Sequence, residues 1–172
     1  MDIAATLRSY DGTRVAPFRA VAEAVRDTPE RAVPRLLDLA ASDEAALQVG
    51  ATWVIKWLAE RGDAPSGESA ARVVDLLDHV NDPDGVLHLL QTLPHMALPA
   101  DRTVALNRAL RRLIRSRRVF LRAWAYNGLG MLAATEPGLR HEVEALFAAA
   151  EERESAAVRA RIRRARAGLP SS

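Results

Sequence analysis

The chain has 172 residues, a formal net charge of +2, 49% apolar residue types and no cysteine. This composition suits one compact domain with a real core, and it excludes disulfides, thiolate chemistry and cysteine-based zinc sites. No apolar run is long enough to span a membrane, and the opening residues lack the basic start and apolar stretch of a signal peptide. We therefore expect a cytoplasmic protein without a membrane-spanning segment.

Helix-favouring residues dominate the chain, and alternating strand patterns of useful length are missing. We expect an all-α protein of about ten helices in antiparallel pairs. The predicted helices lie near residues 3–9, 15–26, 29–40, 43–61, 68–80, 84–93, 101–115, 117–134, 138–151 and 155–167. Pro94 should bend or shorten the helix that begins near residue 84.

A segment near the middle of the chain recurs with its apolar positions intact. Leu47–Ala59 (LQVGATWVIKWLA) aligns with Leu121–Ala133 (LRAWAYNGLGMLA), 74 residues later, and half that interval leads to Val158–Leu169. The implied unit of about 37 residues, built from two helices, cannot bury its apolar side alone. This spacing predicts an α-α superhelix, a solenoid in which each unit packs on its neighbours.

The units resemble HEAT repeats or the related HEAT-like and armadillo-type helical repeats. The likeness rests on an apolar-Arg-Ala start of the second helix, at Leu121-Arg122-Ala123 and Val158-Arg159-Ala160, with a departure at Leu47-Gln48-Val49. It divides a single domain, residues 1–172, into a lead-in over 1–28 and repeats near 29–62, 68–98, 101–134 and 138–168. The resemblance implies a non-catalytic scaffold or adaptor that binds a protein, and it names no cofactor.

Charge is distributed unevenly along the chain. Residues 1–100 contain 9 basic and 15 acidic side chains, a net charge of −6, whereas residues 101–172 contain 15 and 7, a net charge of +8. No acidic residue occurs from 102 to 135, and the candidate binding residues of this stretch are Arg111, Arg112, Arg115, Arg117 and Arg118. Such a cluster can bind phosphates or carboxylates, or it can be a solvated helix face.

The tryptophans allow two interpretations. Trp53 and Trp57 lie one helical turn apart, and Arg61 follows at the same interval and is expected to stack on Trp57. They can form core between repeats, or a surface that stacks on bases or holds a partner helix. Trp57, near the end of its helix, is the candidate for exposure and is added to the binding residues.

Enzyme interpretations find little support in the residues. HEAT-like DNA glycosylases of the alkylation-repair type resemble this chain in pairing a basic groove with tryptophans. The alternative function is therefore a related nucleic-acid-binding protein that uses a basic edge at 108–122. Those enzymes need a carboxylate, however, and neither 45–59 nor 102–135 contains one. HEAT-like di-iron hydroxylases present several His-Glu pairs, whereas only His141-Glu142 occurs here. We assign no catalytic residue and no metal ligand.

Overall fold

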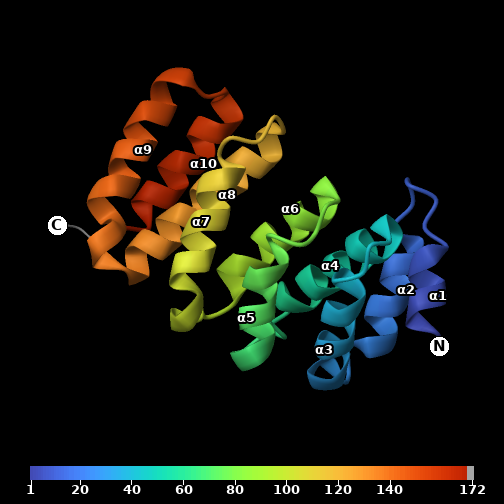
Figure 1. The fold of residues 1–172 in the computed structure, drawn as a ribbon. Helices are drawn as coiled ribbons and strands as arrows, with labels where there is room; N and C mark the ends of the chain where they lie inside the picture. The colour runs from blue at the N-terminus through green and yellow to red at the C-terminus, as the bar shows by residue number, and fades with distance from the viewer. Residues whose placement is uncertain (170–172) are drawn as a thin grey trace. The chain divides into compact units, whose positions relative to one another are not determined.

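The computed structural model describes residues 1–169, and this part of the chain is all-α, with no strand (Figure 1). The ten α-helices are α1 (Ile3–Arg8), α2 (Ala16–Val25), α3 (Pro29–Ala40), α4 (Ala45–Ala59), α5 (Gly67–Leu76), α6 (Pro83–Thr92), α7 (Thr103–Leu113), α8 (Val119–Thr135), α9 (Arg140–Arg153) and α10 (Ala156–Ala167). Three short 3-10 helices, η1 (Leu93–His95), η2 (Ala100–Arg102) and η3 (Pro137–Leu139), lie between them. The predicted all-α class and all ten predicted helices are confirmed.

The helices form two compact units. Unit 1 comprises Met1–Asp101 and unit 2 begins at Arg102. The expectation of a single domain, and that of a continuous superhelix, stay predictions. None of the helices in residues 1–169 combines the length and apolar character of a bilayer-crossing helix.

In unit 1, α4 is the central helix and packs against α1, α2, α3 and α6. Its sequence is apolar on most sides, so that ten of its fifteen residues are buried. Gly50 is the point of closest approach: a Cβ atom there would lie 2.8 Å from both Leu7 Cδ2 and Phe18 Cε1. The absence of a side chain at Gly50 therefore lets α1 and α2 press directly on α4.

The interruption predicted at Pro94 is also confirmed. Helix α6 ends at Thr92, and the 3-10 helix Leu93–His95 follows it. At its other end, the Asp82 side chain accepts hydrogen bonds from the backbone N–H groups of Asp84 and Gly85, as an N-cap does. Helix α6 therefore has a fixed start and a proline-limited end.

In unit 2, α8 is central and packs against α7, α9 and α10. Two glycines lie on sides of α8 that face different helices. A Cβ at Gly128 would lie 2.7 Å from Leu110 Cδ2 on α7, and one at Gly130 would lie 2.8 Å from Ala165 Cβ on α10. Between them, Leu129 is fully buried. Most of α8 is enclosed by its neighbours, but its start is not, since Phe120 is 69% exposed.

Candidate binding surface

The loop between α7 and α8 carries the exposed arginines that we call the basic turn: Arg115, Arg117 and Arg118. Within residues 1–169 the guanidinium groups of these three residues form no hydrogen bond or ion pair, so their charge is available to a partner. No acidic residue of the α7–α8 segment offsets them. The structure thus brings three of the predicted binding residues together in one loop.

A single buried interaction holds this loop in place. Arg122, on the first turn of α8, donates from Nη1 to the carbonyl oxygen of Ser116 at 3.0 Å and to that of Arg117 at 3.3 Å. Its Nε and Nη2 form a two-pronged ion pair with Glu154 at 2.8 and 2.9 Å, and the two side chains are only 19% and 12% exposed. This hydrogen bonding raises the pKa of Arg122, so its charge is permanent. Arg122 therefore joins the loop before α8 to Glu154.

The other two predicted arginines differ from the basic turn. Arg111 donates from Nε to Asn107 Oδ1 at 2.9 Å and forms an ion pair with Glu142 at 2.8 Å, so its charge is largely used inside unit 2. Arg112 is exposed, but it also has an interaction partner in the structure. Glu142 belongs to the His-Glu pair seen in the sequence, and its pairing with Arg111 gives that carboxylate a structural role.

Apolar side chains lie beside the arginines. Phe120 begins the exposed side of α8, and Val104 on α7 is 81% exposed. Val104 lines a shallow depression on α7 together with Asn107, Arg108, Arg111, Arg112 and Arg115. Arginines next to exposed apolar groups are typical of surfaces that bind proteins.

Trp57 lies in unit 1, apart in sequence and in unit from the basic turn. Its ring is partly exposed and is covered by Arg61, whose guanidinium carbon lies 3.7 Å from the ring centroid. Arg61 is also held by a hydrogen bond to the Trp57 carbonyl oxygen at 3.0 Å. The predicted stacking is confirmed, and it covers one face of the ring.

A second pair of this kind was missed in the sequence. The guanidinium carbon of Arg161 on α10 lies 3.9 Å from the centroid of the Trp124 ring on α8. Burial lowers the pKa of Arg161, and the charge of Arg164 lowers it further. The repeat alignment could have indicated this pair. Trp124 and Arg161 occupy matching positions of the segments that begin at Leu121 and Val158.

Unit 2 also contains a partly open pocket of about 400 Å³, which we call the Tyr126 pocket. It is lined by residues from the ends of α7 and α9 and from α8, namely Ile114, Arg115, Tyr126, Leu146, Ala150, Arg153 and Glu154. Three of these seven residues are apolar and the other four carry charge or a hydroxyl, so the pocket is amphipathic. Sequence reasoning did not find it, because its walls come from three separate helices.

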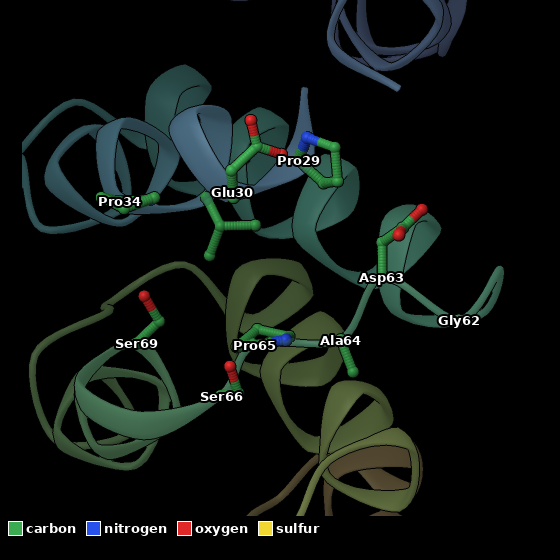
Figure 2. Close-up of a pocket in the computed structure, with 10 residues that line it drawn as sticks. Pro29, Glu30, Pro34, Gly62, Asp63, Ala64, Pro65, Ser66 and Ser69 are labelled. Atoms are coloured by element: carbon green, nitrogen blue, oxygen red, sulfur yellow. The ribbon is translucent and has the colours of Figure 1, made fainter. Parts of the chain in front are cut away.

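Another pocket, of about 330 Å³, lies in unit 1 between α3 and the loop that leads into α5 (Figure 2). Its polar groups are the carboxylates of Glu30 and Asp63 and the hydroxyls of Ser66 and Ser69, and no basic residue lines it. Figure 2 shows the Glu30 carboxylate directed away from the space that Pro34 and Pro65 border. None of the predicted binding residues contributes to this pocket.

The described part of the chain contains no group of three or more potential metal-ligating side chains. Comparisons of the chain with protein-family models, with curated proteins and with solved structures found no match. The function therefore has to be argued from the surfaces themselves.

Proposed function

We propose that the protein is a non-catalytic interaction module of HEAT-like helical pairs, and that its basic turn binds an acidic segment of a protein partner. The observation that carries the proposal is the state of Arg115, Arg117 and Arg118. They are exposed, unpaired within residues 1–169 and held on a loop that a buried ion pair fixes. A loop whose backbone is held before binding loses less conformational entropy on binding.

The repeat assignment is supported by matching contacts in the two units. Helix α4 packs on α3 and α6, and α8 packs on α7 and α10, so the two aligned segments have corresponding neighbours. Gly50, Gly128 and Gly130 each permit a close approach to another helix at the core of its unit. A HEAT-like repeat explains why these segments share an apolar pattern and a packing role.

Unit 1 offers an internal example of the proposed contact. Glu44 precedes α4 at the position that Arg118 occupies before α8, and Arg8 binds it through two hydrogen bonds of 2.7 and 2.8 Å. At this turn of unit 1, therefore, a carboxylate of the turn pairs with a guanidinium from another helix. In unit 2 the charge is reversed, and the complementary carboxylate has to come from a partner.

The nucleic-acid alternative uses the basic edge at 108–122, where Arg111, Arg112, Arg115, Arg117 and Arg118 would contact phosphates and Trp124 of α8 would stack on a base. Two observations favour a protein partner over it. Arg111, Arg122 and Arg166 are already paired with carboxylates, which removes them from phosphate contacts. In addition, Arg161 covers the Trp124 ring on which a base would stack.

The test is fluorescence anisotropy with a labelled glutamate-rich peptide and with labelled single-stranded and duplex DNA and RNA. Replacing Arg115, Arg117 and Arg118 together by glutamate should weaken peptide binding by at least about tenfold and leave the melting temperature unchanged. The matched control replaces Arg159, Arg163 and Arg164 of α10, which changes the net charge equally. Equal loss in both triple variants would show a non-specific charge effect and would contradict the proposal.

The nucleic-acid alternative predicts a different pattern. DNA or RNA should then bind more tightly than the peptide, and the logarithm of affinity should fall with that of salt concentration by roughly one unit per phosphate contact. Failure of every nucleic acid to bind would remove this alternative.

A further inference from the structure

We propose that the exposed side of α8 receives an amphipathic helix of the protein partner, and that an acidic residue of that helix binds the basic turn. This side of the helix, which we call the α8 face, is formed by Phe120, Trp124, Asn127 and Met131. The inference rests on the proposed function, and it adds the shape of the partner segment to its charge. In unit 1 the corresponding side of α4 is occupied, which indicates what fits here.

The α8 face is apolar and open. Its residues recur at intervals of four, three and four positions, so they lie on one side of the helix. Phe120 is 69% exposed and the other three are partly exposed, whereas Leu129 on the opposite side is fully buried. The Asn127 amide donates from Nδ2 to Met131 Sδ at 3.5 Å, so it is engaged within the face. None of the four residues carries a charge.

The corresponding side of α4 is covered by helices of the chain itself. Gly50 occupies the position in the repeated segment that Trp124 occupies in α8. A Cβ atom at Gly50 would lie 2.8 Å from both Leu7 of α1 and Phe18 of α2. The ring of Trp53, three residues further along α4, has its centroid 5.9 Å from that of Phe18. In unit 1, therefore, helices with buried apolar residues occupy this side of the repeated segment.

The charge at the edge of this side differs between the units. On α1, Ile3 and Leu7 are buried, and the next residue, Arg8, forms the two hydrogen bonds to Glu44 immediately before α4. Arg118 has the position of Glu44 before α8, and its guanidinium has no partner within residues 1–169. A helix that lay on the α8 face as α1 lies on α4 would therefore need an acidic residue where α1 has Arg8. A second copy of α1 would bring two arginines together, which is unfavourable.

Helix α10 adds a cation beside the α8 face. The guanidinium carbon of Arg161 lies 3.9 Å from the centroid of the Trp124 ring, and no described residue forms an ion pair with it. Neither α8 nor α10 contains an acidic residue, so every charge on these two helices is positive. Apolar side chains bordered by arginines suit a helix that has apolar residues on one side and glutamate or aspartate beside them.

The experiment compares two labelled peptides of identical composition by fluorescence anisotropy with the full-length protein. In the first, leucines recur four residues apart and glutamates follow them, as Arg8 follows Leu7 in α1; in the second, the same residues are scrambled. The amphipathic peptide should bind about tenfold more tightly. Phe120→Ala should remove most of this preference and leave the melting temperature unchanged, because Phe120 is exposed. The matched control Val104→Ala, at an exposed apolar residue of α7, should preserve it.

A charge exchange tests the contact at the edge separately. Arg118→Glu gives this position the sign of Glu44, so it should weaken binding of the amphipathic glutamate peptide. The same variant should strengthen binding of a version with lysine in place of glutamate, by at least about threefold. No gain for the lysine peptide would show that the helix does not lie on α8 as α1 lies on α4, and it would overturn the inference.

The remaining outcomes separate this inference from the proposed function. If both glutamate peptides bind equally and the double variant Arg117→Glu/Arg118→Glu abolishes both, the basic turn binds acidic chains and the helix inference is wrong. If neither peptide binds, the proposed function fails as well. Self-association that Phe120→Ala abolishes, or binding to phosphatidylserine vesicles in place of the peptide, would identify another occupant of the α8 face and overturn the inference.

Discussion

Gln48 in unit 1 and Arg122 in unit 2 occupy the same position of the repeated segment. Both side chains connect the turn before their own helix to a later turn, one as a neutral amide and the other as a cation. Each reaches back six residues to a serine carbonyl: Gln48 Nε2 donates to Ser42 at 2.8 Å, and Arg122 Nη1 donates to Ser116 at 3.0 Å. Each also reaches forward to the turn before the next pair's second helix. In both units this position therefore holds a long polar side chain that makes several hydrogen bonds, and the charge of that side chain differs between them.

The forward contacts show the difference between the two units. Gln48 Oε1 accepts from the backbone N–H groups of Asn81 and Asp82, both at 3.0 Å, so it binds backbone. Arg122 instead binds a side chain, Glu154. Unit 2 thus depends on a pair of charges where unit 1 uses a neutral amide, and the following variants test that comparison.

The largest effect is expected in the shared core. Ile55 in α4 and Leu129 in α8 occupy matching positions and are fully buried. Ile55→Ala and Leu129→Ala should each lower the free energy of unfolding by about 2–5 kcal/mol, measured by chemical denaturation, because each leaves a cavity. Val104→Ala at an exposed position is the control. A negligible change at either buried site would contradict the equivalence of the two helices.

The next largest loss of stability is expected on replacing Arg122 or Gln48. Arg122→Ala should cost about 2–4 kcal/mol, because Glu154 would stay largely buried without its partner. Gln48→Ala should cost about 1–3 kcal/mol, because two backbone donors lose their acceptor. A double-mutant cycle with Glu154→Ala should recover part of the loss in unit 2. Strict additivity in that cycle would show that the ion pair does not stabilise the loop.

Acid should affect unit 1 through His88. Burial, aided by the charge of Lys56, lowers the pKa of His88 from 6.5 to about 4. As the pH falls from 6.5 towards 4, the unfolded chain takes up a proton that the folded chain does not, so stability falls by roughly 3 kcal/mol. Urea unfolding at neutral and at acidic pH should show this loss, and His88→Gln should reduce it. An unchanged pH dependence in the variant would rule out His88 as the cause.

The smallest effect on stability is expected at Glu44, which occupies the position before α4 that Arg118 occupies before α8. Glu44→Gln removes the charge that Arg8 binds, but both side chains are half exposed. Solvent screening makes such a pair a weak contributor to stability. Differential scanning calorimetry should show no measurable shift in melting temperature. A clear shift would mean that α1 depends on this ion pair as well as on the close approach at Gly50.

Local sequence signals predicted the helices well, because apolar periodicity, capping residues and Pro94 act within a few residues of one another. The basic turn was predictable for the same reason, since Arg115, Arg117 and Arg118 are neighbours in the chain. The state of each arginine was not predictable. Arg111 and Arg122 find their carboxylates 31 and 32 residues away, at Glu142 and Glu154, and only packing brings these partners together.

The Tyr126 pocket escaped the sequence analysis for a related reason. Tyr126 lies in the apolar segment Leu121–Ala133, and its side chain is buried. The other walls of the pocket come from α9 and from the residues that follow α7 and α9, which the sequence pattern of α8 does not describe.

The glycines on either side of Leu129 have a consequence for motion. Because α7 and α10 approach the α8 backbone where a side chain would otherwise separate them, water has little access to the amides of that stretch. In isotope exchange, the amides around Leu129 should be the last of unit 2 to take up deuterium, while those near Phe120 exchange early. The start of α8 can then adjust to whatever docks there without loosening the middle of the helix.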